Sequence, residues 1–514
     1  MLSKLYSAAV YGIDGFLVTV EVDLSLGLPG INIVGLPDTA IKESQHRVQA
    51  AIKNNGYPFP LRKITINLAP ADIKKEGAAF DLPIACGILS AFGVIKNKNF
   101  ERFIILGELS LDGLLRPIRG VLPMSLMAKQ LGFQGIILPK ENAQEAAIVK
   151  EISVFGFSHL NEVINFLNGS LNIEETKINV DEIFDTYSEY DIDFTDVKGQ
   201  FHAKRALEIA AAGGHNVLMI GPPGSGKTML AKRVVTILPK MAIEESLETT
   251  KIHSVAGYLP TNQPLIATRP FRAPHHTTSE ANLIGGGAIP KPGEISLAHN
   301  GVLFLDELPE FHRDVLESLR QPLEDGFITI GRSKFTVTYP ARFMLIAAMN
   351  PCPCGYFGDP YKNCSCSTNA IKRYRQKASG PLLDRIDIQI EVPSLKFEEL
   401  TNKDSGESSK TIRERVEKAR KIQQERFSEL KKKKRIFANS QMDNKDIKKF
   451  CEISEKSQNL IKLAMEKFGL SARAYHRILK VARTIADLAG EEKIKEAHIA
   501  EAIQYRSFDK VVIF

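Results

Sequence analysis

The chain has 514 residues, a length that predicts about two to four domains and excludes a single small core. Its hydrophobic content of 44% and charged content of 25% are typical of a soluble globular protein, and no apolar run is long enough to cross a bilayer. Gly12 and Asp14 interrupt the N-terminus before a signal-peptide core could form, so we expect a cytoplasmic protein without a membrane partner. The formal net charge of +7 permits an anionic partner.

Strands and helices alternate through the first block of the chain, residues 1–167. Strands are predicted at residues 17–22, 31–35, 63–68, 102–107 and 133–138, and helices at 39–53, 85–92 and 122–131. This alternation predicts an α/β or α+β domain. Residues 168–195 follow, and because they are rich in Asp and Glu and show little periodicity, we expect an acidic linker there.

A strand, a glycine-rich loop and a helix follow one another at residues 216–238, inside a predicted second domain at 196–398. The loop has the phosphate-binding pattern and consists of Gly221, Pro222, Pro223, Gly224, Ser225, Gly226, Lys227 and Thr228. Glycines let backbone N–H groups surround an anion, while Lys227 reaches the β and γ phosphates and Thr228 holds Mg²⁺. The alternative is a chance glycine turn, but the strand and the helix stand where phosphate binding requires them. The sequence therefore predicts ATP and Mg²⁺ as cofactors.

Polar residues suited to nucleotide hydrolysis follow downstream. An apolar strand ends in Asp306, which is placed to hold Mg²⁺, and in Glu307, which is placed to polarise the attacking water. The next apolar strand ends before Asn350, which orients the same water, contacts the γ phosphate or simply caps the following turn. Further on, Arg385 either stabilises charge in the transition state or pairs with a neighbouring aspartate.

Four of the six cysteines cluster within fifteen positions, in a segment that also contains Gly355, Gly358 and Pro360. Two Cys-x-Cys pairs of this kind can place four thiolates around Zn²⁺, and they are Cys352, Cys354, Cys364 and Cys366. The alternatives are reduced free thiols and a redox switch. We favour a structural Zn²⁺, because so dense a cluster is hard to explain as core packing.

The last block, residues 399–514, is helical and charged. Helices predicted at residues 411–427, 457–468, 472–489 and 494–506 form a lid. Residues 430–435 form a basic run, and residues 331–339 alternate like a hairpin that carries Arg332 and Lys334. Each of these basic segments either contacts phosphates or is simply solvated.

The order of these motifs resembles an AAA+ ATPase, and several stretches resemble the magnesium-chelatase-like branch and, within it, the ComM/YifB family. The stretches are residues 271–277, 284–287, 349–355, 379–387, 471–479 and 484–488. The resemblance implies an α/β AAA+ P-loop NTPase core with a C-terminal α-helical lid. It also implies a ring-forming homo-hexamer in which residues 271–299 face the channel.

The same resemblance assigns roles to individual residues. Asn350 is the sensor residue, Arg385 is the finger for a neighbouring subunit, and Arg473 is the second sensor in the lid. Arg375 is the alternative to Arg385 as the finger. His275 and His276 are adjacent, and because adjacent residues rarely converge on one ion, we expect no metal there.

Residues 67–85, together with 107–142, resemble the Lon-protease-type domain of the S5-like superfamily, which implies an N-terminal α+β domain. The serine and lysine positions of that family fall on Ala79 and near Leu122, which supply neither a nucleophile nor a base. We therefore expect a catalytically inactive domain. A generic interaction domain is the alternative and makes the same functional prediction.

Together these features predict an ATPase that acts as a ring motor on branched or single-stranded DNA. By family resemblance it is a branch-migration helicase that supports natural transformation or recombination. The first alternative is a protein-remodelling or metal-insertion ATPase that resembles magnesium chelatase or MoxR and does not act on DNA. The second is a degenerate Lon-like protease, which Ala79 and Leu122 argue against.

Overall fold

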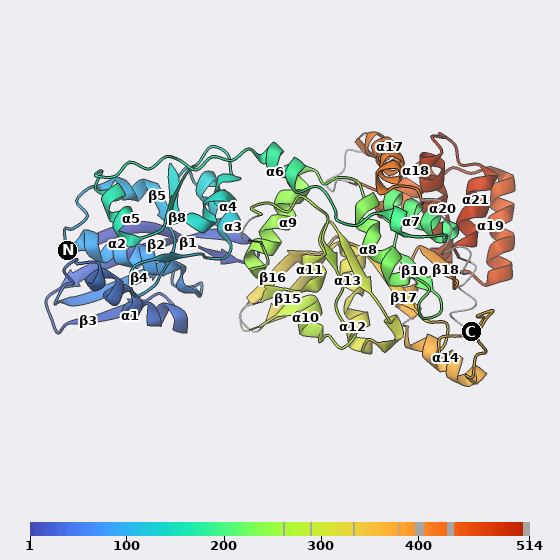
Figure 1. Cartoon of the computed structure of the whole chain (residues 1–514), viewed down its shortest axis with the longest axis horizontal. Helices are drawn as coiled ribbons and strands as arrows, with labels where there is room; N and C mark the ends of the chain where they lie inside the picture. Colours follow the sequence, from blue (N-terminus) through green and yellow to red (C-terminus); the bar gives the residue numbers. More distant parts are fainter. Residues whose placement is uncertain are drawn as a thin grey trace. The chain divides into compact units, whose positions relative to one another are not determined.

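The computed structural model describes residues 1–260, 263–287, 290–332, 335–378, 380–395, 406–428 and 436–506. Two compact units form the chain: Met1–Tyr187 with Ile243–Ala267, and Ser188–Ala242 with Thr268–Phe514 (Figure 1). The passage from the first unit to the second falls inside the predicted acidic linker. Part of that stretch is ordered, since it contains helix α6 (Val180–Thr186).

The first unit is built on a seven-stranded mixed sheet of order β3-β4-β2-β1-β5-β8-β9. Strand β2 is antiparallel to β1 and β4, and the other pairs are parallel. The strands are β1 (Leu2–Tyr11), β2 (Asp14–Ser25), β3 (Gly30–Val34), β4 (Lys63–Ala69), β5 (Phe103–Ile105), β8 (Gly135–Pro139) and β9 (Ser153–Phe157), with a separate small pair β6 (Glu108–Leu109) and β7 (Leu115–Arg116). Alternation along β2 sends Val18, Val20 and Val22 into one core and Leu17 toward another, so both faces of the sheet are covered.

Helices cover the two faces of this sheet. One core contains residues of α1, α2 and α5, and the other contains residues of α3 and α4. The helices are α1 (Thr39–Asn54), α2 (Asp81–Ala91), α3 (Val121–Gln130), α4 (Ala143–Ala147), α5 (Leu160–Leu167), α6 and α9 (Ile243–Ala256). Ala79 lies in a short 3-10 helix and Leu122 is fully buried in α3, so neither position offers catalytic chemistry.

Helix α9 belongs to this first unit although it follows the phosphate loop in sequence, and it packs against α3. The buried carboxylate of Glu145 joins the two helices, because it accepts the backbone N–H of Leu122 at 2.9 Å and the hydroxyl of Ser254. Burial raises the pKa of Glu145. The sequence did not predict that this segment would join the N-terminal block.

The second unit is built on a five-stranded sheet of order β11-β14-β17-β10-β18, in which every neighbouring pair is parallel. The strands are β10 (Val217–Ile220), β11 (Phe271–Arg272), β14 (Val302–Leu305), β17 (Met344–Met349) and β18 (Ile388–Glu391). Every residue of β10, β14 and β17 is buried, as expected for central strands of a parallel sheet. The carboxyl ends of these strands therefore meet at one edge.

Short helices and two hairpins surround this sheet. The helices are α7 (Phe201–Gly213), α8 (Lys227–Ile237), α10 (Glu280–Ile284), α11 (Glu294–Leu297), α12 (Arg313–Ser318), α13 (Arg320–Asp325), α14 (Thr368–Lys377) and α15 (Gly380–Leu383). The hairpins are β12 (Gly285–Gly286) with β13 (Lys291–Pro292), and β15 (Phe327–Arg332) with β16 (Phe335–Pro340). The second confirms the predicted hairpin, but the side chain of Arg332 and all of Lys334 lie outside the described residues.

The C-terminal helices form the predicted lid and share one hydrophobic core with α7, α8 and the sheet. They are α17 (Ser409–Ser428), α18 (Asn444–Phe450), α19 (Glu455–Phe468), α20 (Ala472–Leu488) and α21 (Glu496–Gln504). The basic run at residues 430–435 lies outside the described residues. None of the helices in the described part of the chain combines the length and apolar character needed to span a bilayer.

Candidate functional site

The glycine-rich loop joins β10 to α8 with the geometry of a phosphate cradle. Gly224 and Gly226 have φ of 78° and 92°, a region that strongly favours glycine, and Gly226 caps the start of α8. A Cβ on Gly221 would lie 2.1 Å from the carbonyl oxygen of Val392, so only glycine fits there. The backbone N–H groups of the first turn of α8 therefore follow the loop directly, an arrangement suited to an anion.

Lys227 is buried at the start of α8, and its ammonium group donates to three oxygen atoms, two of them in the phosphate loop. It donates to the carbonyl oxygens of Gly221 at 2.8 Å and Pro222 at 2.9 Å, and to Asn350 Oδ1 at 3.3 Å. Burial lowers the pKa of Lys227, while the charges of Asp306 and Glu307 oppose that shift. These hydrogen bonds hold the ammonium group beside the phosphate loop.

Two side-chain contacts connect the three strand ends that the sequence singled out. Thr228 Oγ1 donates to Asp306 Oδ2 at 2.7 Å, which joins the phosphate loop to the end of β14. The contact between Lys227 and Asn350 joins the same loop to the end of β17. A hydroxyl and a carboxylate at this distance form an oxygen donor set of the kind that Mg²⁺ prefers.

Glu307 lies next to Asp306, in a left-handed conformation with φ of 54°. Such strain in a residue other than glycine is concentrated at functional sites. Its Oε2 lies 3.1 Å from Nδ1 of His276, which follows β11 in the segment 271–277. The sequence argued against His276 as a metal ligand and placed it in a loop expected to face the channel. It did not predict this contact, for which no local spacing gives a signal.

Arg385 and Arg375, the two alternatives for the finger, lie in different surroundings. Arg375 is 8% exposed, donates from Nε to the carbonyl of Pro351 at 3.1 Å, and stacks on Phe357 at 5.2 Å. It therefore connects α14 to the cysteine loop. Arg385 forms an ion pair with Glu324, whose side chain is 56% exposed, so this pair reaches the surface. The sequence offered Asp384 or Asp387 as a partner of Arg385, and the structure places Glu324 there as an ion-pair partner.

Arg473 lies in the first turn of α20, and its side chain is 66% exposed and lies 3.7 Å from Asp384, the residue before Arg385. One helical turn later, Arg477 pairs with the buried carboxylate of Asp387, which also contacts His215 Nδ1 at 3.2 Å. Burial alone would raise the pKa of Asp387, but the charges of Arg477 and His215 hold it well below its usual range. These contacts fix the lid to the segment that carries Arg385.

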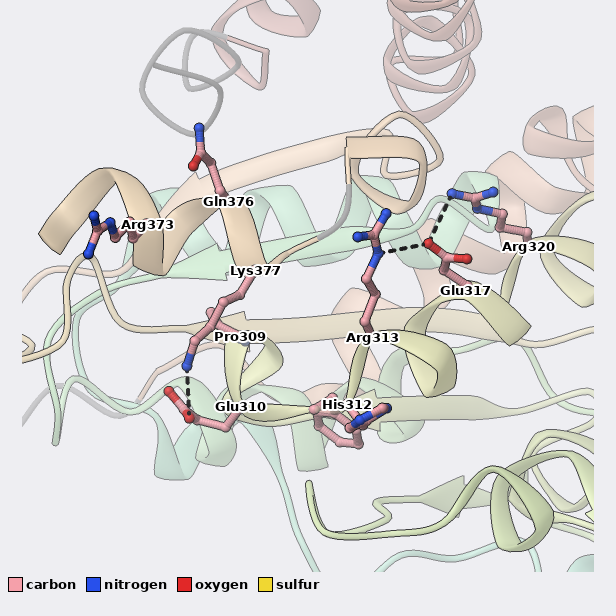
Figure 2. A pocket seen from close by; sticks show the side chains of 10 residues that line it. Pro309, Glu310, His312, Arg313, Glu317, Arg320, Arg373, Gln376 and Lys377 are labelled. Carbon is pink, nitrogen blue, oxygen red and sulfur yellow. Dashed lines mark hydrogen bonds and ion pairs between the residues drawn. The ribbon is translucent and has the colours of Figure 1, made fainter. Parts of the chain in front are cut away.

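The second unit contains a basic pocket of about 620 Å³, and its first lining residue, Pro309, follows Glu307 by two positions in the sequence (Figure 2). Its lining comes from the segment after β14 and from α14, and consists of Pro309, Glu310, Phe311, His312, Arg313, Glu317, Arg320, Arg373, Gln376 and Lys377. Glu310 pairs with Lys377 at 3.4 Å and Glu317 with Arg313 at 3.0 Å. The lining contains three arginines and one lysine against these two glutamates, so positive charge is in excess. The ring of Phe311 packs edge-on against His276, which places the pocket beside the Glu307 contact.

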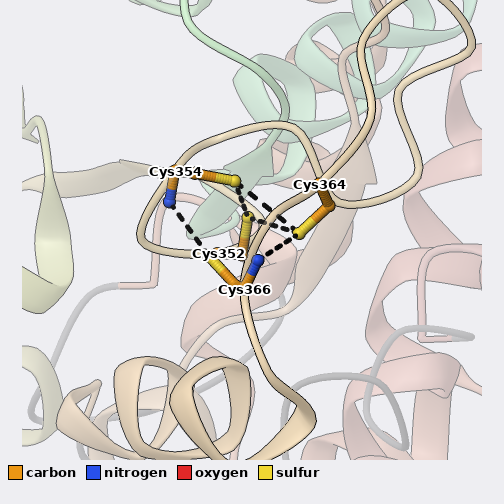
Figure 3. A group of neighbouring side chains, drawn as sticks. All are labelled: Cys352, Cys354, Cys364 and Cys366. Carbon is orange, nitrogen blue, oxygen red and sulfur yellow. Dashed lines mark hydrogen bonds between the residues drawn. The ribbon is translucent and has the colours of Figure 1, made fainter.

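The four clustered cysteines converge on one point (Figure 3). The group Cys352, Cys354, Cys364 and Cys366 has its sulfur atoms within 4.8 Å of one another, and among the described residues it is the one group of His, Cys, Asp or Glu found able to hold a metal ion. Backbone N–H groups of Tyr356 and Ser365 lower the pKa of the Cys354 thiol to about 6.

Three family models match the chain in succession. One described as magnesium chelatase, subunit ChlI, matches residues 193–400, and one described as subunit ChlI of Mg-chelatase matches residues 20–142. A third, described as the C-terminal part of magnesium chelatase subunit ChlI, matches residues 406–506. Together they span both units.

Two relatives are similar over nearly their whole length, and a third is similar over part of it. Competence protein ComM of Haemophilus influenzae is 46% identical over 513 residues, which cover 99% of this chain and 98% of that protein. An uncharacterized protein of Escherichia coli, YifB, is 43% identical over 514 residues, which cover 100% of this chain and 98% of that protein. Lon protease 2 of Bacillus subtilis is 33% identical over 161 residues, or 28% of each chain.

Proposed function

Because the chain belongs to the ComM/YifB family of magnesium-chelatase-like AAA+ proteins, we propose that it is an ATP-driven ring motor acting on DNA. The fold class is that of an AAA+ P-loop core with a Lon-like N-terminal α+β domain and a helical lid. The proposed cofactors are ATP with Mg²⁺, and Zn²⁺ at the cysteine cluster. The proposed assembly is a homo-hexamer.

The observation that carries the ATPase proposal is the pair of contacts from the phosphate loop to Asp306 and Asn350. In the proposed reaction, Lys227 would exchange its carbonyl acceptors for β- and γ-phosphate oxygens, and Thr228 and Asp306 would hold Mg²⁺. Asn350 would contact the γ-phosphate. Glu307 would leave His276 to polarise the attacking water, so its contact with His276 opposes hydrolysis in the conformation described here.

The proposed site is completed by a cation from a neighbouring subunit, and Arg385 is the proposed finger. Arg473 is the proposed second sensor in the lid, and its side chain lies 3.7 Å from Asp384, the residue before Arg385. A guanidinium supplied in trans stabilises transition-state charge by about 10³–10⁵ in rate in related phosphoryl transfers. Glu324 must release Arg385 for that step.

DNA as the substrate is supported by the name of the Haemophilus relative, which is a competence protein, and by the excess of cations in the pocket beside Glu307. Arg373 is exposed on α14 and, among the described contacts, has no ion-pair partner, so it suits a phosphate. We propose branch migration of incoming DNA as the activity.

The experiment that tests this proposal is ATP hydrolysis by the full chain with no DNA, with single-stranded DNA and with forked DNA, alongside Lys227→Ala. We expect forked DNA to stimulate hydrolysis by the wild type and Lys227→Ala to be inactive. Hydrolysis that ignores all DNA, with no branch movement, would contradict the DNA part. That result would favour the protein-remodelling or metal-insertion alternative, to which the chelatase models point.

A further inference from the structure

The sulfur positions of the cysteine cluster match a tetrathiolate metal site. Cys352 Sγ lies 3.3 Å from Cys354 Sγ and 3.7 Å from Cys364 Sγ, and the last two are 3.6 Å apart. Four sulfurs at about 2.3 Å from a central Zn²⁺ are about 3.8 Å from one another in a regular tetrahedron. The site is therefore assembled at nearly the dimensions that zinc requires.

Two backbone N–H groups point at sulfur atoms of the cluster. The backbone N–H of Cys354 donates to Cys366 Sγ at 3.4 Å, and that of Cys366 donates to Cys364 Sγ at 3.4 Å. A disulfide requires about 2.05 Å between sulfurs, and all four cysteines are free. Three of the four are only half-buried, so they do not serve as core packing. Four converging cysteine sulfur atoms are a donor set suited to a divalent cation.

The cluster loop contacts the phosphate loop directly. Gly355, the residue after the second cysteine, approaches Pro223 so closely that a Cβ there would lie 2.6 Å from Pro223 Cδ. Its φ of 87° and the bond from its N–H to Cys352 O at 3.0 Å form a tight turn at that contact. The position of the turn against Pro223 thus depends on the cysteines on either side of it.

The same cluster fixes Asn350 and α14. Asn350 precedes the first cysteine by two positions and accepts from Lys227. The last cysteine is followed by Ser367, whose hydroxyl accepts the N–H of Ala370 and caps α14. Arg375 returns from that helix to the carbonyl of Pro351. Between β17 and α14 the described chain contains only turns and loops, so the cysteines are the main cross-link within it.

We infer that Cys352, Cys354, Cys364 and Cys366 bind one Zn²⁺, and that this ion positions the phosphate loop and Asn350 through Gly355 and Pro351. The zinc part stands on the sulfur geometry alone. The positioning part rests on the proposed ATPase. Zinc has no redox chemistry, and four thiolates leave no open coordination position, so the ion acts by holding the loop in place.

Metal analysis of the purified full chain tests the zinc part. We expect one zinc per chain, and a Co²⁺-substituted protein with the intense visible absorption of a tetrahedral thiolate complex. Cys364→Ser/Cys366→Ser should lose both signals, while Cys451→Ala, which alters a buried cysteine outside the cluster, should keep them. Wild-type protein that retains no zinc after exposure to Zn²⁺ and desalting, or a double variant that still binds one equivalent, would overturn the assignment.

Two further measurements test the positioning part. We expect the zinc-free double variant to lower kcat for ATP about 10- to 100-fold while its melting curve stays cooperative. Gly355→Ala should keep its zinc but lower kcat, because its Cβ displaces the loop from Pro223. Unchanged hydrolysis and unchanged binding of a fluorescent ATP analogue in both variants would overturn the positioning role. If the wild type hydrolyses no ATP, the proposed function fails, while the analogue-binding comparison still tests positioning.

Discussion

The pair between Arg477 and Asp387 should decide whether the lid stays attached to the segment that carries Arg385. The change Asp387→Asn keeps the shape of a fully buried side chain but removes its charge. Breaking one partner of a buried ion pair costs about 3–5 kcal/mol. Arg477 is 22% exposed and also reaches the carbonyl of Arg385 at 3.2 Å, so we expect the lower end, about 3 kcal/mol.

Thermal unfolding measures this loss, and about 3 kcal/mol corresponds to a fall in Tm of about 6–12 °C. The matched control is Asp384→Asn, which removes an exposed contact 3.7 Å from Arg473 and should change Tm by less than about 2 °C. Equal shifts in the two variants would refute the reasoning.

The difference in stability between wild type and Asp387→Asn should depend on pH, because folding lowers the pKa of Asp387. A carboxylate whose pKa is depressed by folding stabilises the protein above its unfolded pKa of about 3.9, and that stabilisation is lost as pH falls toward the folded pKa. The gap in stability between wild type and Asp387→Asn should therefore stay constant from about pH 8 to pH 5 and narrow only below about pH 4.

Three further predictions concern the nucleotide site and the basic pocket. Thr228→Ala should lower kcat at least about 100-fold, while Thr228→Ser, which keeps the hydroxyl that contacts Asp306, should retain activity; equal activities in a steady-state ATPase assay would contradict the Mg²⁺ role. His276→Ala should raise DNA-independent hydrolysis about 3-fold, because it removes a partly exposed contact that holds Glu307, and a fall in rate would show that His276 assists the reaction instead. Arg373→Glu should weaken DNA binding and reduce the salt slope of the binding constant by about one, and an unchanged slope would exclude this residue from the DNA contact.

The parts of the fold with strong local signals could be predicted from sequence. The strand at residues 217–220 matches β10, because a short apolar run ends at a glycine loop. The helix predicted at 472–489 matches α20, where Ser471 caps the first turn. By contrast, no strand was predicted at the N-terminus, where β1 (Leu2–Tyr11) pairs with β2 over its whole length. Small and polar residues interrupt the apolar alternation of β1, so its sequence gives only a weak signal for a strand.

Contacts between distant segments could not be predicted. The pair of His276 with Glu307 and the pair of Arg385 with Glu324 each join residues that share no helical or strand spacing. The same is true of α9, which packs against α3 and contacts Glu145 of α4 through Ser254. The cysteine cluster is the exception, since residue type alone indicated that its members would converge.

The central claim is that ATP lies at the interface between two subunits, with Lys227 on one side and Arg385 on the other. Mixing equal amounts of the inactive variants Lys227→Ala and Arg385→Ala tests it directly, with DNA-stimulated hydrolysis as the readout. In a ring assembled at random, about a quarter of the interfaces regain both residues, so the mixture should recover up to about a quarter of wild-type activity. A mixture that exchanges subunits and stays as inactive as either variant alone would contradict the claim.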